Sequence, residues 1–398
     1  MILRRVAITA MAVAALAGAG TARQSTSAGS PAVRVIALPD FWGASAIWGA
    51  IGSDPGGHIW LGITSNDEKT ASAHLFEFDP ATEAVVDRGN VVAELERLRL
   101  RRPQERQMKI HSRIVHMPDG HLYFSSMDES GENPDGSTLP TWGGHLWRLR
   151  RPGFTWEHLA KTPEALIAVA GGGPFVYALG YFNHVLYQFN TRTRAIRSVT
   201  VGSAGGHVSR NFFADDRGHV FVPRAVKAGD KLSAFLVELD AQLKEVSSHP
   251  LPDYFERGLD ESHGIVAAHP DGHGGWFFAT GKGRLFQVEP VAGGPSRVVD
   301  RGWFHPSGAR YVASMFRGET DGRLYGVASA SGYGDRRFEW ITRRRDGTAT
   351  VAPLPYGDVQ EFPHGALLYG SAARDRSGRF YVAGTMRYKP VLLQITPQ

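Results

Sequence analysis

Short runs of alternating apolar and polar residues, each preceded by a turn signal, repeat along most of this chain. The turns carry Asp-Gly or Gly-Gly pairs, which supply the positive φ that tight hairpins need, and β-branched and aromatic residues follow them. Such runs are typical of half-buried strands. The copies occupy residues 54–62, 118–124, 172–177, 215–222, 272–278, 321–326 and 375–382.

Every copy is followed by a second alternating run. These runs are residues 74–78, 145–149, 185–189, 235–239, 284–288, 338–341 and 391–395. With one outer strand, such as residues 195–201, each unit forms a four-stranded antiparallel blade. The sequence therefore predicts an all-β fold, a seven-bladed β-propeller spanning residues 23–398 as one domain.

The two ends of the predicted domain are expected to meet. The last run leaves too little chain for an outer strand, and residues 33–38 form a spare strand near the start. We expect this segment to complete blade seven and close the ring.

The first residues have the order of a secretory signal peptide. Arg4 and Arg5 precede an apolar run over residues 6–17, and small residues follow to Ala22. We expect residues 1–22 to be removed and the protein to be secreted or periplasmic. No later stretch approaches the roughly 20 apolar residues of a membrane helix, so no membrane contact is expected after removal.

Composition narrows the chemistry and the partners. The chain has no cysteine, which excludes disulfides, thiolate nucleophiles and Cys-ligated zinc. Its formal net charge is +5, with basic residues scattered except over residues 97–106. This charge is too weak for nucleic acid as the main partner but suits an acidic polysaccharide or oligosaccharide. We expect a monomer that requires no cofactor.

Two segments interrupt the repeat. Residues 91–109 are charged with helical spacing, and residues 127–142 form a Gly-, Pro-, Asp- and Ser-rich insertion between the second and third strands of blade two. Loops of this kind lie over a binding face or simply decorate the surface.

Blade geometry selects candidate functional residues. In a four-stranded meander, the loop entering the innermost strand and the loop joining the second and third strands lie at the same end of the ring. The residues that this rule brings together include His111, His145, Tyr181 and Arg210, from three consecutive blades. Ser209 falls beside Arg210 in blade four, and Trp48 and His263 fall at the matching places in blades one and five.

Simpler roles exist for several of these residues. Tyr181 could pack beside Phe182, and Arg210 could pair with Asp215 or Asp216. The aromatic residues expected in the core are Trp60, Tyr123, Phe221 and Trp276. Those expected at surface turns on the far face are His58, His121 and His219.

A cluster of histidine, tyrosine and arginine without an acidic partner suits removal of a proton next to a carboxylate. Arginine pairs with the carboxylate of a uronate and stabilises the developing enolate. A neutral His or an ionisable Tyr takes the C5 proton, and a second group protonates the leaving oxygen. Hydrolysis normally needs two flanking carboxylates, and no such pair is predicted at this face.

Four short runs, at residues 110–114, 143–147, 177–181 and 208–212, carry a resemblance to a known family. Through them the chain resembles the seven-bladed propeller polysaccharide lyases that include ulvan lyases and rhamnose-glucuronate lyases. The resemblance implies a carbon–oxygen lyase acting by β-elimination on a glycan of rhamnose and glucuronate, with His111, His145, Tyr181 and Arg210 as its catalytic residues. Some members carry a structural metal, which leaves a metal possible here, although no metal ligand is assigned.

The chain also departs from that family. Insertion 127–142 separates the two histidines and suggests a different substrate cleft, and Tyr187 competes with Tyr181 for the tyrosine position. We expect Tyr187, His207, His263 and Trp142 to contact substrate. A non-catalytic carbohydrate- or protein-binding propeller and a metal-dependent lactonase or hydrolase remain alternative functions.

Overall fold

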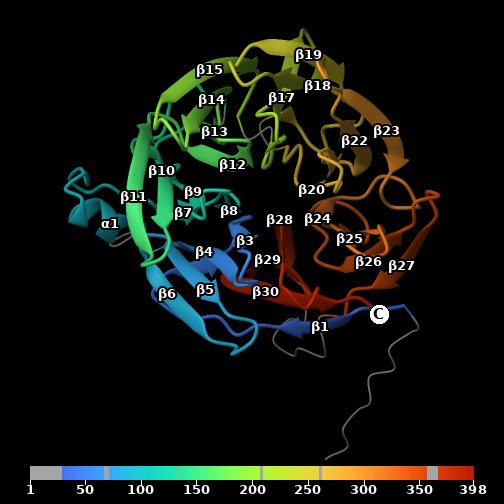
Figure 1. Ribbon diagram of the computed structural model, residues 1–398, viewed down its shortest axis with the longest axis horizontal. Coiled ribbons are helices and arrows are strands. Elements are labelled where there is room, and N and C mark those ends of the chain that lie inside the picture. The colour runs from blue at the N-terminus through green and yellow to red at the C-terminus, as the bar shows by residue number, and fades with distance from the viewer. Residues whose placement is uncertain (1–28, 67–70, 134, 207–208, 260–261, 356–365) are drawn as a thin grey trace, which may run out of the picture.

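The computed structural model describes residues 29–66, 71–133, 135–206, 209–259, 262–355 and 366–398. Seven antiparallel sheets surround a common axis, as Figure 1 shows from blue at the start of the chain to red at its end. The predicted seven-bladed β-propeller is confirmed. The expected signal peptide, residues 1–22, lies outside the described residues.

The first three blades follow the predicted strand order. Blade one has β3 (Ile51–Ser53), β4 (Ile59–Ser65), β5 (His74–Phe78) and β6 (Val85–Asn90), with β2 (Ala44–Ala46) also paired to β4. Blade two has β7 (Lys109–Ile110) and β8 (Val115–His116) innermost, then β9 (Leu122–Asp128), β10 (Gly143–Arg150) and β11 (Thr155–Thr162). Blade three has β12 (Leu166–Gly172), β13 (Phe175–Gly180), β14 (Asn183–Asn190) and β15 (Ile196–Ser203).

The next three blades repeat this order. Blade four has β16 (Phe213–Ala214), β17 (Val220–Ala228), β18 (Lys231–Leu239) and β19 (Glu245–Pro250). Blade five has β20 (Ala268–Pro270), β21 (Trp276–Ala279), β22 (Arg284–Glu289) and β23 (Arg297–Trp303). Blade six has β24 (Val312–Arg317), β25 (Leu324–Ser329), β26 (Phe338–Arg343) and β27 (Ala349–Pro353).

Blade seven joins the two ends of the described chain. It has β28 (Leu367–Arg374), β29 (Phe380–Met386) and β30 (Lys389–Thr396), and β1 (Ala32–Val35) is its outer strand (Figure 1). The register runs from Ala32 opposite Thr396 to Val35 opposite Leu393. The predicted closure is confirmed, with the strand placed one residue earlier at its start than expected.

The closing strand gives a prediction about stability. A chain that starts at Leu38 loses the pairing of β1, the burial of Ile36, and the packing of Val33 and Val35 against the core. We expect its free energy of unfolding to fall by about 3 to 5 kcal/mol and its Tm by roughly 4 to 6 °C. Thermal unfolding measures both. A chain that starts at Gly29 is the control, and equal melting of the two chains would contradict the role of β1.

A buried anchor explains why the turn motif repeats. The turn aspartate accepts a hydrogen bond from an aromatic side chain of the following strand: Tyr123 donates to Asp119 over 2.6 Å, and Tyr381 donates to Asp375 over 2.8 Å. Trp60 donates to Asp54 in the same way over 3.1 Å. The bond satisfies both groups and ties the turn to the blade. The aromatic residues predicted as core are buried, except that Trp276 is only partly buried.

The innermost strands approach one another closely around the axis. A Cβ atom on Gly52 would lie 1.9 Å from the carbonyl oxygen of Ile114 in blade two, so only glycine fits there. Asn211 of blade four donates to Val266 O over 2.5 Å and lies 3.4 Å from Gly370 O of blade seven. The axis is therefore narrow, and the two ends of the ring present separate surfaces.

The single described helix lies outside the ring. Helix α1 (Val91–Arg97) packs beside blade two, with Asn90 as its N-cap accepting from the Ala93 N–H (Figure 1). The helical spacing over residues 91–109 thus gives a short helix and a long loop. In the described part of the chain, no helix combines the length and apolar character needed to cross a membrane.

Candidate functional site at the upper mouth of the ring

The end of the ring where the innermost strands begin is called here the upper mouth. It also receives the loops between second and third strands. The opposite end, which carries the turns between first and second strands, is the lower mouth. Blade geometry predicted that the candidate residues share the upper mouth. Their side-chain contacts show which of them lie within one cluster.

His111 and Arg210 form the centre of the upper mouth. Arg210 Nη1 donates to His111 Nε2 over 2.9 Å, and His111 Nδ1 donates to the Ile167 carbonyl oxygen over 3.0 Å. His111 is buried, and Arg210 is half-buried. Burial, and next the charge of Arg210, lower the pKa of His111 well below its usual value of 6.5. The ring is therefore neutral at physiological pH, with its lone pair on Nε2.

Tyr181 packs edge-on against His111, with 6.5 Å between ring centroids. Its hydroxyl donates to Glu129, whose other carboxylate oxygen pairs with Lys109. Burial, and next the charge of Glu129, raise the pKa of Tyr181 well above its usual value of 10. Sequence reasoning missed Glu129 and expected no acidic partner. Its position in the insertion 127–142 of blade two was the one available signal.

The upper mouth also holds hydrogen-bond donors that the protein does not use. Arg210 Nε and Trp48 Nε1 are buried and have no hydrogen-bond partner among the described residues. The Arg210 guanidinium lies 5.1 Å from the Tyr369 ring and 5.8 Å from the Trp48 ring. Buried donors without partners are costly, so they favour a ligand rich in acceptors.

Blades five and six extend the site. His263 Nδ1 lies 3.0 Å from Glu256 Oε1, and the His263 ring is 4.4 Å from Tyr333 between centroids. The His263 carbonyl oxygen accepts from the Arg210 N–H over 3.0 Å, which fixes the backbone of Arg210. His263 thus lies at the upper mouth, next to Arg210.

The comparisons with known proteins add the fold and no more. No family model matches the chain, and no curated protein matches it. The solved structures that it resembles include U3-55K, with a TM-score of 0.56 and 9% identity over 92% of this chain and 98% of that chain. Another is the β-propeller domain of the Trilobed protease from Pyrococcus furiosus, with a TM-score of 0.48 and 9% identity over 88% and 94%. At these identities the likeness concerns the fold alone.

His145 does not join the cluster at the upper mouth, contrary to expectation. Its Nε2 lies 3.1 Å from Glu105 Oε1, and its Nδ1 lies 2.8 Å from His158 Nε2. The ring also packs beside Trp147, in a fully buried position. His145 is on the third strand of its blade, and there its ring packs under the loop that carries Glu105. The pKa of Glu105 falls to about 2 because hydrogen bonds from His145 and Arg102 outweigh burial.

The remaining sequence expectations have mixed outcomes. Tyr187 donates its hydroxyl hydrogen bond to Glu164, not to a member of the cluster formed by His111, Tyr181 and Arg210. Burial raises the pKa of Glu164 to about 7. His207 lies outside the described residues. Arg210 does not pair with Asp215, which binds Arg217 instead.

Trp142 lies in an arginine-lined cleft beside the upper mouth. The cleft has a volume of about 1080 Å³ and lies between the loop after α1 and the insertion of blade two. The Arg102 guanidinium stacks 5.0 Å from the Trp142 ring, and the carbonyl oxygen of Trp142 accepts from Arg102 over 2.7 Å. Ser130 lines the cleft, while the preceding residue, Glu129, faces Tyr181. The arginines that line it are Arg99, Arg101, Arg102 and Arg106.

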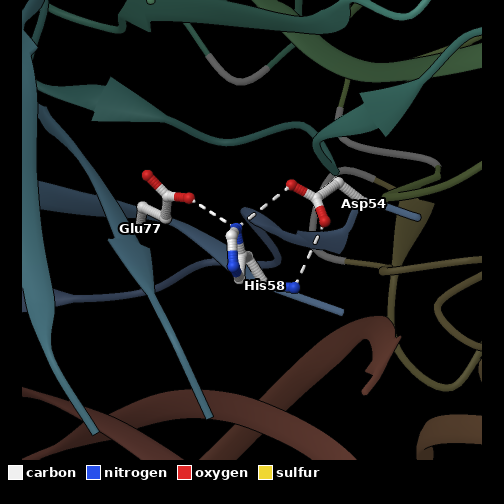
Figure 2. Close-up of side chains that lie close together, drawn as sticks. All are labelled: Asp54, His58 and Glu77. Atoms are coloured by element: carbon white, nitrogen blue, oxygen red, sulfur yellow. Dashed lines mark hydrogen bonds and ion pairs between the residues drawn. The ribbon is translucent and has the colours of Figure 1, made fainter. Parts of the chain in front are cut away.

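One further group has the residue types of a metal site. Figure 2 shows His58 between Asp54 and Glu77, and its Nδ1 lies 2.7 Å from Glu77 and 3.6 Å from Asp54. His58 is therefore not the simple surface residue that was expected. Both carboxylates already pair with arginine: Arg151 lies 2.8 Å from Asp54, and Arg88 bonds Glu77 over 2.7 Å. Asp54 also anchors its turn through Trp60, so each carboxylate of the group has partners within the protein.

Proposed function

We propose that the protein is a polysaccharide lyase that cleaves a uronate-containing glycan by β-elimination at the upper mouth. The observation that carries the proposal is the contact of Arg210 with neutral His111, with Tyr181 packed against the same imidazole. A cation, a neutral base and a protonated acid within one cluster are the groups that this reaction needs.

Arg210 is suited to bind the uronate carboxylate. Its planar fork pairs with a carboxylate through two hydrogen bonds, and Nε is available for one of them. Trp48 Nε1 supplies another donor nearby, and the rings of Trp48 and Tyr369 offer apolar faces to a sugar. Neutralising the carboxylate acidifies the C5 proton and stabilises the enolate that forms when it leaves.

His111 is suited to remove the C5 proton. Its Nδ1–H is held by a backbone carbonyl, which fixes the tautomer and leaves Nε2 as the basic nitrogen. When Arg210 turns to a carboxylate, Nε2 is released to accept the proton. The electron pair of the C5–H bond then forms the C4–C5 double bond as the C4–O bond breaks.

Tyr181 is suited to protonate the leaving oxygen. Because its pKa is raised well above 10, the hydroxyl stays protonated, and its hydrogen turns from Glu129 to the leaving oxygen as the C4–O bond breaks. After the elimination, the proton that His111 took from C5 replaces the proton that Tyr181 gave to the leaving oxygen. Both residues then return to their starting protonation states, and the reaction consumes no water. The physical evidence therefore favours His111 as base and Tyr181 as acid, a choice that the sequence left open.

The arginine-lined cleft supports a polymeric substrate. It adjoins the upper mouth through residues 128–130, so a chain held at Arg210 can continue along it. The arginines there would pair with further acidic groups, and Trp142 would stack on a sugar ring. We propose, in addition, that the mature protein begins near residue 23, is secreted or periplasmic, acts as a monomer and needs no cofactor.

The pKa shifts predict an unusually broad pH profile. Protonation of His111 would remove the base only well below pH 6.5, and ionisation of Tyr181 would remove the acid only well above pH 10. We expect kcat/KM to stay level between these limits. Initial rates across pH 5 to pH 10 measure it, and an acidic limb centred near pH 6.5 would contradict a buried, neutral His111.

The decisive assay follows the ultraviolet absorbance of an unsaturated uronate. The purified protein is incubated with ulvan, other glucuronate polymers and rhamnose-capped glucuronides. We expect absorbance to rise on at least one acidic glycan and to survive treatment with a chelator. Binding without any product would favour the non-catalytic carbohydrate-binding propeller. Activity lost to the chelator alone would favour a metal-dependent hydrolase.

A further inference from the structure

The lower mouth of the ring holds a cluster of arginines that the proposed reaction does not use. A cavity of about 560 Å³ opens there between the turns of blades one, five, six and seven. His269, Arg317 and Arg374 line it from three neighbouring innermost strands. A fourth arginine, Arg376, lies at its rim and donates to the Pro55 carbonyl oxygen over 2.8 Å.

Arg113 reaches the same region from the other side of the axis. It leaves the inner strand of blade two, and its Nη2 lies 3.4 Å from the Ala268 carbonyl oxygen in blade five. Its guanidinium stands 5.7 Å from the Trp276 ring centre, and its Nε is buried without a hydrogen-bond partner among the described residues. Burial lowers the pKa of His269 to about 4, and the charges of Arg113, Arg317 and Arg374 act in the same direction.

The carboxylates of this region are already engaged by other groups. Asp54 pairs with Arg151, Asp375 with Arg379, and Glu319 with Arg374. In the described part of the chain, neither Arg113 nor Arg317 has a carboxylate within ion-pair distance. Two guanidinium groups at the lower mouth therefore have no counter-ion among the described residues, and the Nε atom of one of them, Arg113, is buried.

We propose that the lower mouth binds a tetrahedral dianion of the sulfate or phosphate class, held by Arg113, Arg317 and Arg374. The number of uncompensated charges matches the charge of such an ion. Tetrahedral oxygens can take donors from several directions, which suits guanidinium groups that arrive from blades two, six and seven. A buried charge without a partner is costly, so an anion that enters also stabilises the fold.

The proposal is tested by titrating the protein with sodium sulfate in a calorimeter at low, fixed ionic strength. We expect one site in the wild-type protein. Arg317→Met, which removes a partly exposed side chain without a described partner, is expected to weaken sulfate at least about tenfold. Arg197→Met removes the same charge from the exposed outer strand of blade three and is expected to bind like the wild type. Equal binding by all three proteins would overturn the proposal.

Arg113→Met provides a second, independent readout. Because this substitution removes an uncompensated charge, the variant is expected to melt no lower than the wild type in low salt, and to lose the extra rise in Tm that sulfate gives over sodium chloride of equal ionic strength. A lower Tm together with a full sulfate response would overturn the role of Arg113. Should this variant not fold, the Arg317→Met titration still decides the question.

The site is separate from the upper mouth, and the source of the anion can be distinguished. Arg210→Ala is expected to bind sulfate like the wild type, and loss of the site in that variant instead of Arg317→Met would overturn the assignment. Competition by glucose 6-sulfate or glucose 6-phosphate, with glucose as control, indicates a group carried on a sugar. Binding of the free ions without such competition indicates inorganic sulfate or phosphate.

Discussion

Arg210→Ala is expected to lower lyase activity at least about 1000-fold while the protein stays folded. The loss follows because no other guanidinium among the described residues contacts His111, so the uronate carboxylate would remain unneutralised next to the base. The backbone of Arg210 is held independently, through its N–H to His263 and that of Asn211 to Ile265. Initial rates of absorbance increase, with circular dichroism and Tm on the same samples, measure the effect.

Two further variants sharpen this test. Arg210→Lys keeps the charge and loses the two-pronged geometry, so its activity should lie between those of the wild type and the alanine variant. Arg197→Ala removes an exposed arginine from the outer strand of blade three and should leave the rate unchanged. Full activity in Arg210→Ala would reject the upper mouth as the site of elimination.

Tyr181→Phe is expected to lower kcat by about 100-fold to 10,000-fold with little change in KM. The substitution removes the hydroxyl alone, and the ring keeps its place between His111 and Phe182. Glu129 keeps its pairing with Lys109, so the surrounding charges persist. Steady-state kinetics on the best glycan separate the effects on kcat and KM.

Tyr187→Phe is the matched control for this prediction. It removes an equivalent hydroxyl from β14, where Tyr187 bonds to Glu164 and not to His111 or Arg210. We expect its kcat to stay within about twofold of the wild-type value. An equal loss in both variants, or a loss in Tyr187→Phe alone, would reject Tyr181 as the acid.

Patterns local to the sequence predicted the architecture. The turn pairs and the alternating runs predicted the number of blades. They could do so because the conformation of a hairpin depends on its own few residues and their φ angles. The spare strand at residues 33–38 predicted ring closure for the same reason. The positions of His111, Tyr181 and Arg210 relative to the predicted strands then placed all three residues at one mouth. Each lies before an inner strand or between a second and a third strand, and the meander fixes which end of a blade those loops occupy.

The tertiary structure alone decided which side chains meet. His145 fits the same placement rule, yet its ring packs against His158 and Glu105, because side-chain direction on a third strand depends on the neighbouring blade and the loop above it. Glu129 comes to Tyr181 from 52 positions away in sequence, through an insertion with no periodic pattern. The sequence could not predict that Arg113 has no counter-ion among the described residues, because this depends on side chains from all the surrounding blades and not on any one segment.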